Sequence, residues 1–455
     1  MAEPEITGGA GGVSADYADL AMLARGSDDL ARTLGRVAVD CHAVAADPDV
    51  LASAVLSPVT AARFEAALVE ALDGPGGLSG QAAEFGVRAV GLRAASASYE
   101  ATDAAGAALI DAVRWSAGAM APVTLPAGIA GLLITDPGIV TGLIEDPGSF
   151  QRIITDHPGI VDAVVGGAPG LLGVLTGGGV VTDVKGGADL IAGLYPDGTP
   201  VVTDVTDRFP DQPRGTVVPG SLGDIVDGLD YRNGQVPGGT PDRIDVKRIV
   251  DPDGTEAFVV NIPGTKDWNL PFNGFNPETN DLGTNVRVLG GDVTARQHAI
   301  AMALREAGAS STDPVMLVGH SQGGMVAAQA AHDRGTADFD FNVTHVVTAG
   351  SPIGRVDVPD GVQVLSLENE HDLVPHLDAA DNPDRPNWTT VTFADQQGSA
   401  ESNHGTETSY LPAGRALDQS TNPSVTGFRD SASAFLPGGR DVRMEVSVYE
   451  LGRKP

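Results

Sequence analysis

The sequence has few of the residues that several common chemistries require. It contains one cysteine, Cys41, in 455 residues, which excludes an intrachain disulfide and a cysteine-based metal site. Aromatic residues make up 5% of the chain, so the core must consist mainly of Ala, Val, Leu and Ile. With 28 basic against 60 acidic residues, the net charge is −32 and no basic stripe is present. This charge balance argues against a nucleic-acid partner.

Long apolar runs are also missing. The longest uncharged stretch, residues 163–181, is interrupted by seven glycines and by Pro169, so we expect no membrane-spanning helix. The first residues, MAEPEITGGAGG, are acidic and lack the apolar segment of a secretory signal peptide. The sequence therefore leaves the compartment open between the cytoplasm and export without such a signal.

Composition divides the chain into three zones. Residues 1–120 show helical spacing of apolar side chains and predict an N-terminal helical bundle. Residues 121–195 repeat a proline–glycine pair every 10 or 11 positions and predict a series of short helices. Residues 196–455 alternate strand and helix patterns, which predicts an α/β fold with a mostly parallel sheet flanked by helices.

The strongest motif follows a short apolar run and precedes a helix pattern rich in small residues. It reads Gly319-His320-Ser321-Gln322-Gly323-Gly324. A serine on a tight strand-to-helix turn needs glycine two residues before it and two residues after it, because side chains there would collide. The motif therefore predicts Ser321 as a nucleophile and Gly319, Gly323 and Gly324 as structural glycines of the turn. His320 is expected to face away and pack. The alternative is an ordinary hydroxyl in a glycine-rich turn.

A nucleophilic serine needs a base and an acid that orients the base. Asp372 follows a predicted strand and is the preferred acid, with Glu368, Glu370 and Asp378 as rivals. Two histidines follow Asp372. His404 lies in a polar loop and is the preferred base, whereas His376 is only four residues from the acid.

Acyl transfer also needs N–H donors for the oxyanion. We expect these donors at Gln322, directly after the serine, and at Thr265, where a strand pattern ends. Trp268, Phe272 and Phe275 follow Thr265 and form a candidate substrate pocket, although plain packing onto the core explains them equally well. No metal or other cofactor is expected. Asp378, Asp381 and Asp384 could bind Ca²⁺, but a solvated acidic loop is the preferred interpretation.

These motifs resemble those of α/β-hydrolases, and they are most similar to the lipase class 3 branch. The resemblance covers about residues 240–415 and rests on the Pro263-Gly264-Thr265 loop, the Ser321 motif, Asp372 and His404. It implies an α/β-hydrolase fold, a triad of Ser321, Asp372 and His404, and an oxyanion hole at Thr265 and Gln322. Separately, Tyr99-Glu100-Ala101-Thr102-Asp103 resembles the export motif of actinobacterial type VII secretion substrates.

The sequence thus predicts a serine hydrolase that cleaves carboxylic esters, with a small ester or a lipid as substrate. Amide or thioester cleavage by the same triad is one alternative. Another alternative is a binding or export-associated protein with a vestigial hydrolase domain, in which residues 14–120 meet a helical partner.

Overall fold

The computed structural model describes residues 4–9, 17–45, 47–74, 76–93, 183–209, 217–234, 241–268 and 275–455. The chain divides into two compact units, of which one comprises residues 14–110 and the other residues 1–13 and 111–455. Most of the proline–glycine zone predicted above, as well as the Tyr99 motif, lies outside the described residues. No helix in the described ranges is long and apolar enough to cross a membrane.

The smaller unit is a helical hairpin. Its helices are α1 (Tyr17–Ala45), α2 (Pro48–Leu56), α3 (Pro58–Asp73) and a further helical stretch over residues 78–93. Gly35 of α1 lies opposite Ala82 of the returning arm, and a salt bridge joins His42 of α1 to Asp73. The contact between the two arms includes small residues of α1, because Ala24 and Ala38 are buried. The predicted helical character of this zone therefore holds over the described residues between 17 and 93.

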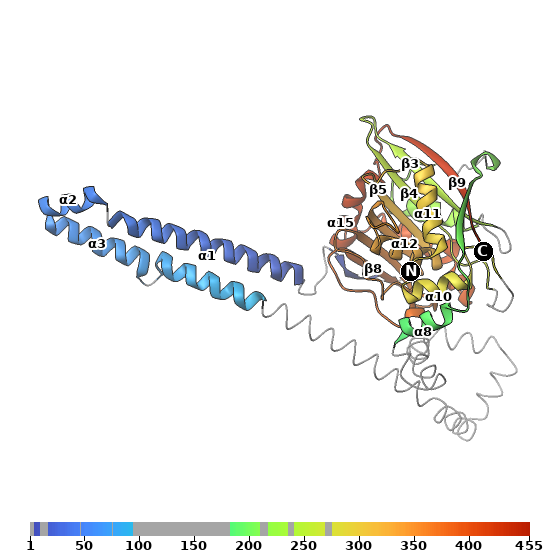
Figure 1. Cartoon of the computed structure of the whole chain (residues 1–455), viewed down its shortest axis with the longest axis horizontal. Helices are drawn as coiled ribbons and strands as arrows, with labels where there is room; N and C mark the ends of the chain where they lie inside the picture. The colour runs from blue at the N-terminus through green and yellow to red at the C-terminus, as the bar shows by residue number, and fades with distance from the viewer. Residues whose placement is uncertain are drawn as a thin grey trace, which may run out of the picture. The chain divides into compact units, whose positions relative to one another are not determined.

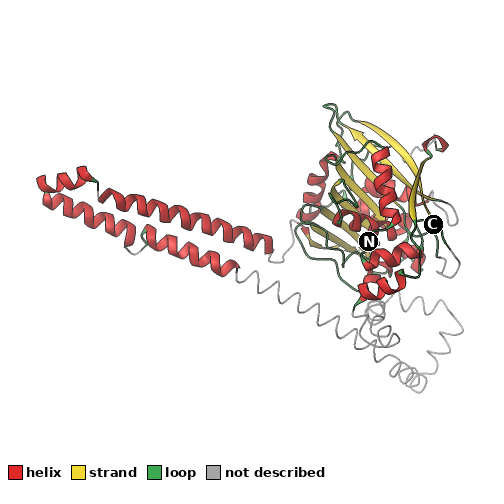
Figure 2. Ribbon diagram, viewed as in Figure 1, coloured by secondary structure: helices red, strands yellow, loops and turns green. Residues whose placement is uncertain are grey.

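The larger unit is built on one nine-stranded sheet (Figures 1 and 2). Its strand order is β1-β8-β7-β6-β5-β4-β3-β9-β2. The strands are β1 (Glu5–Gly8), β2 (Thr199–Asp204), β3 (Asp242–Val250), β4 (Glu256–Ile262), β5 (Pro314–His320), β6 (Asn342–Ala349), β7 (Gln363–Asn369), β8 (Trp388–Phe393) and β9 (Arg443–Lys454). Strands β4 to β8 are parallel, and the other four pairings are antiparallel. The sheet is therefore mixed, where the sequence pattern predicted a mostly parallel one.

Helices cover both faces of this sheet (Figure 2). The helices of this unit are α8 (Val184–Ala192), α9 (Leu222–Gly234), α10 (Leu282–Gly290), α11 (Ala295–Glu306), α12 (Gln322–His332), α13 (Ala400–His404), α14 (Leu411–Leu417) and α15 (Pro423–Ser431). Side chains of α10, α11 and α12 belong to one core layer, and those of α9, α14 and α15 belong to the other. Along β5, Val315 and Leu317 enter the first layer while Met316 and Val318 enter the second, as the two-residue period of a strand requires.

The first strand corrects the assignment of residues 1–120 to a helical bundle. Residues 5–8 form β1 and pair antiparallel with β8, from Glu5 opposite Thr392 to Gly8 opposite Thr389. A four-residue segment has no helix-stabilising contacts of its own, whereas the open edge of β8 offers it a ladder of hydrogen bonds. The segment therefore belongs to the sheet of the larger unit.

Candidate active site

The carboxyl ends of β4, β5, β7 and β8 bring the predicted site residues to one edge of the sheet. Parallel strands end at the same edge, where the loops that follow them meet. Thr265 follows β4, Ser321 follows β5, Asp372 follows β7 and His404 follows β8. Residues that lie up to 139 positions apart in the sequence thus belong to neighbouring loops.

Ser321 sits on a strained turn between β5 and α12. Its backbone has φ 56° and ψ −124°, and only Ala379 shares a positive φ among the described residues other than glycine. Such a conformation costs about 1–3 kcal/mol and persists only where the surroundings enforce it. A strained serine between a buried strand and a helix is the geometry predicted for the nucleophile.

The glycines of the motif make this turn sterically feasible. A Cβ atom on Gly319 would lie 2.3 Å from the carbonyl carbon of Gly323, and one on Gly323 would lie 2.1 Å from the carbonyl oxygen of Ile262. A Cβ atom on Gly324 would lie 2.1 Å from Ser351 Oγ. No side chain fits at any of the three positions without moving the elements that hold Ser321.

Asp372 and His404 form a hydrogen-bonded pair. His404 Nδ1 lies 2.7 Å from Asp372 Oδ2, and the carboxylate is buried. The Tyr410 hydroxyl donates to the same oxygen at 2.5 Å, and the backbone N–H of Val374 donates to Oδ1 at 3.0 Å. Burial and the negative charge of Asp372 raise the pKa of Tyr410 well above its usual value, so its phenol keeps the proton that it donates.

His404 also lies against the residue that precedes the serine. The rings of His320 and His404 are 4.4 Å apart between centroids, and His320 Nε2 lies 2.8 Å from the carbonyl oxygen of His404. Burial lowers the pKa of His320 well below its usual value, so the ring is neutral. Because a carbonyl oxygen only accepts, Nε2 carries the proton and donates it. His320 therefore does not face away, as the motif suggested, but holds the backbone of His404.

Two buried asparagines tie the acid loop to the helix that carries His404. Asn369, the last residue of β7, donates to the carbonyl oxygen of Asn403 at 3.2 Å and to Ser409 Oγ at 2.9 Å. Asn403 in turn donates to the carbonyl oxygen of His371 at 2.8 Å. Sequence reasoning missed both asparagines and also Tyr410. Of the three, Asn369 and Asn403 could have been found from the sequence. Asn369 ends the strand that precedes Asp372, and Asn403 directly precedes His404.

The loop after β4 lies beside Ser321. A Cβ atom on Gly264 would be 3.0 Å from Ser321 Cβ. Thr265 Oγ1 donates to Asn285 Oδ1 at 3.2 Å and accepts from Asn285 Nδ2 at 2.8 Å, so the hydroxyl proton is already engaged within the protein. Gln322 is the first residue of α12, where a backbone N–H has no acceptor within the helix. The loop that carries Thr265 and the first turn of α12 thus both adjoin Ser321.

Comparisons of this chain with family models, with curated proteins and with solved structures give no match.

His404 pairs with Asp372 rather than with one of the rival acids. Glu370 is exposed, and His376 lies in the short helix Val374–Asp378. Burial raises the pKa of Glu368 to about 8 and that of Asp378 to about 7. A carboxyl group with so high a pKa is a poor partner for an imidazolium, whereas Asp372 contacts His404 directly.

The aromatic residues after Thr265 do not gather in the described structure. The Trp268 side chain is 64% exposed, and the ring of Phe275 lies against Gly198, which precedes β2. Phe272 lies outside the described residues. The predicted substrate pocket therefore receives no support from Trp268 or Phe275.

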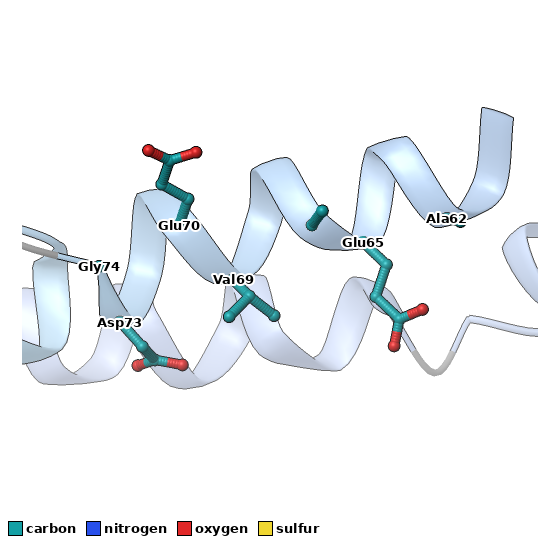
Figure 3. Close-up of a pocket in the computed structure, with 7 residues that line it drawn as sticks. Ala62, Glu65, Val69, Glu70, Asp73 and Gly74 are labelled. Carbon is teal, nitrogen blue, oxygen red and sulfur yellow. The ribbon is translucent and has the colours of Figure 1, made fainter. Parts of the chain in front are cut away.

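Two further surfaces carry no comparable chemistry. A hollow on α3 is lined by residues of that helix and by Gly74, which follows it, and presents the carboxylates of Glu65, Glu70 and Asp73 (Figure 3). A small cavity of about 130 Å³ lies between α10, α12 and the loop that carries Arg355. Within the described ranges, no group of three His, Cys, Asp or Glu side chains is arranged to hold a metal ion, including Asp378 and its neighbours.

Proposed function

We propose that this chain is a serine hydrolase that cleaves carboxylic esters through an acyl-enzyme. Two observations carry the proposal: the strained backbone of Ser321, and the 2.7 Å contact between His404 Nδ1 and the buried carboxylate of Asp372. The resemblance of the motifs quoted above to those of class 3 lipases supports the proposal, and so does a sheet in which β4 to β8 are parallel.

The chemistry assigns one role to each group. Ser321 Oγ attacks the acyl carbon and forms a C–O bond while His404 Nε2 takes the hydroxyl proton. The backbone N–H groups of Gln322 and Thr265 bind the oxyanion. His404 then gives its proton to the leaving alcohol, and water repeats the sequence to release the acid. Asp372 holds the ring so that Nε2 faces the serine, and it stabilises the imidazolium.

One contact of this scheme has to form when substrate binds. In the described part of the chain Ser321 Oγ makes no hydrogen bond, although the His404 ring lies 4.4 Å from the ring of His320, the residue before the serine. Catalytic hydrogen bonds are often long without substrate and shorten in the complex.

Fluorophosphonate labelling with peptide mapping tests the proposal directly. We expect one labelled site at Ser321, and we expect turnover of p-nitrophenyl acetate and butyrate to disappear in Ser321→Ala. Ser366→Ala, which removes another buried serine of the same sheet, is the matched control and should keep its activity. Turnover retained in Ser321→Ala would refute the mechanism. Butyryl anilide and butyryl thioester substrates in the same assay separate ester from amide and thioester cleavage.

A second proposal concerns the helical hairpin, for which the candidate function is the binding of a helical partner. Leu23, Leu30, Val37 and Val44 recur every seven residues along α1 and are 42–49% exposed. A seven-residue apolar stripe is the pattern through which helices associate. Light scattering of the full chain should detect an assembly that Leu30→Glu dissociates. A monomer with and without the substitution would contradict self-association.

A further inference from the structure

One buried arginine contacts both arms of the proposed oxyanion hole. Arg296 of α11 is fully buried, and its guanidinium holds Asp242 of β3 with two hydrogen bonds of 2.8 and 2.9 Å. It donates a third hydrogen bond to Gln322 Oε1 at 2.7 Å and a fourth to the carbonyl oxygen of Pro263 at 3.0 Å. The guanidinium of Arg296 thus makes four hydrogen bonds to three separate segments of the chain.

The last two contacts are the informative ones. Gln322 supplies one proposed oxyanion amide, and Pro263 lies two residues before Thr265, which supplies the other. A single planar group therefore holds the residue after the nucleophile and the loop after β4 at a fixed separation. Arginine suits this task because its donors form a rigid fork, whereas a lysine ammonium is a point charge on a flexible stem.

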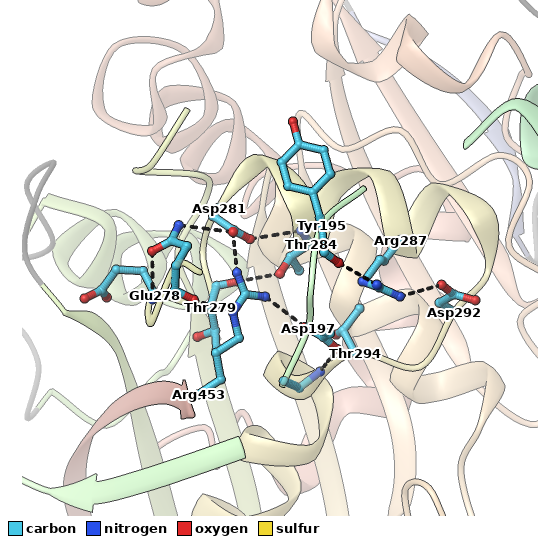
Figure 4. A network of polar contacts seen from close by, with 12 residues as sticks. Tyr195, Asp197, Glu278, Thr279, Asp281, Thr284, Arg287, Asp292, Thr294 and Arg453 are labelled. Atoms are coloured by element: carbon cyan, nitrogen blue, oxygen red, sulfur yellow. Dashed lines mark hydrogen bonds and ion pairs between the residues drawn. The ribbon is translucent and has the colours of Figure 1, made fainter. Parts of the chain in front are cut away.

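The far side of Gln322 is anchored as well. Its Nε2 donates to the carbonyl oxygen of Asp281 at 2.5 Å, and the Asp281 carboxylate caps α10 by accepting from Thr284 N at 3.0 Å. Figure 4 shows Arg453 directed at Asp281 and at Asp197, with which it forms ion pairs. Gln322 is therefore clamped between Arg296 and a network that spans α10 and β9.

Stability alone is a weak reason for such an arrangement. Burying a charged pair has a desolvation penalty that often cancels its attraction, and apolar replacements can be as stable. A geometric task explains it better, because oxyanion donors must already be in place as charge develops in the transition state.

We propose that Arg296 is a positioning residue that sets the spacing of the two oxyanion donors. The inference rests on the proposed serine hydrolase function. It predicts that a substitution at Arg296 raises the free energy of the transition state, and so lowers kcat, while substrate binding stays almost unchanged.

The test compares Arg296→Lys with a matched control, Arg232→Lys. Arg232 is also fully buried, on α9, and pairs with Asp245 at 2.7 Å. With p-nitrophenyl butyrate and a fluorophosphonate end-point titration to count active sites, we expect kcat of Arg296→Lys to fall about 10–100-fold while KM stays within about threefold. Affinity for a boronic acid, which mimics the tetrahedral oxyanion, should fall by a similar factor. Arg232→Lys should keep wild-type kcat per active site.

A second variant tests the inference even if Arg296→Lys does not fold. Gln322→Leu keeps the backbone amide and the Arg296–Asp242 pair but removes the side-chain clamp, and we expect the same loss of kcat at nearly constant KM. Wild-type kcat per active site in both variants, or an equal loss in Arg232→Lys, would overturn the inference. Failure of the proposed function is a separate result, since it appears as turnover that survives in Ser321→Ala.

Discussion

Asp378 should make the stability of the larger unit depend on pH in an unusual direction. The carboxyl group is 1% exposed and accepts hydrogen bonds from the backbone N–H groups of Ala380 at 3.2 Å and Arg355 at 3.3 Å. Burial raises its pKa from 3.8 to about 7. The folded state therefore keeps a proton that the unfolded chain releases above pH 3.8, so stability falls as pH rises from about 4 to about 7.

The size of this effect follows from the shift. One pKa unit corresponds to about 1.4 kcal/mol, so the loss amounts to at most about 4 kcal/mol above pH 7. Asparagine resembles the protonated acid in shape and cannot ionise. We expect Asp378→Asn to match the wild type near pH 4 and to exceed its free energy of unfolding by up to about 4 kcal/mol at pH 8.

Urea denaturation at pH 4, 6 and 8 measures this difference. Fluorescence of Trp388, which is buried in β8, reports on the unit that contains Asp378. Asp384→Asn is the control, because that carboxyl group is exposed in the same loop and its removal should give no such trend. A stability difference that stays constant from pH 4 to pH 8, or that favours the wild type at pH 8, would refute the reasoning.

Two further predictions concern other buried groups. Tyr410→Phe removes the hydroxyl that donates to Asp372, and it should cost about 1.5–3 kcal/mol of stability and lower kcat without changing KM, as thermal denaturation and ester kinetics would show. Wild-type values for both would contradict the role of the hydroxyl. Burial lowers the pKa of His345 to about 4, so the unfolded chain binds a proton between pH 6.5 and 4 that the folded state does not. The free energy of unfolding should fall by about 3 kcal/mol as the pH falls from 6.5 to 4. Denaturation curves of His345→Gln, measured at several pH values, should show that this free energy depends less on pH.

The sequence predicted the central strands and helices because their apolar patterns are local. Strands β4 to β8 and helices α11 and α12 form the alternation of strands and helices that was predicted within residues 196–455. Strand β9 was missed, since charged residues such as Arg443, Glu445 and Glu450 mask its alternation. Its pairing with both β3 and β2 gives it a place in the sheet that its own residues do not reveal.

The candidate site likewise combines residues that have a local sequence signal with residues that have none. The spacing of the glycines around Ser321 predicted the turn, because the glycine pattern itself lies within six residues, although Gly323 and Gly324 face the distant residues Ile262 and Ser351. Arg296 gave no such signal, since a charged residue in an alanine-rich helix usually faces water. Its burial depends on Asp242, Gln322 and Pro263, which three distant segments supply. His320 was misjudged for a similar reason, since its partner is a carbonyl oxygen 84 positions downstream.

The pairing of Glu5 with Thr392 has a consequence for the nascent chain. A ribosome adding about 5–20 residues per second needs about 20–80 s to travel from one partner to the other. During that interval β8, the strand with which β1 pairs, has not yet been made. Once β8 is complete, its outer edge pairs with β1, the first strand of the chain. Closure of that edge therefore has to wait until the unit of residues 14–110 and strands β2 to β8 have been translated, whereas β9 joins the sheet between β3 and β2 later still.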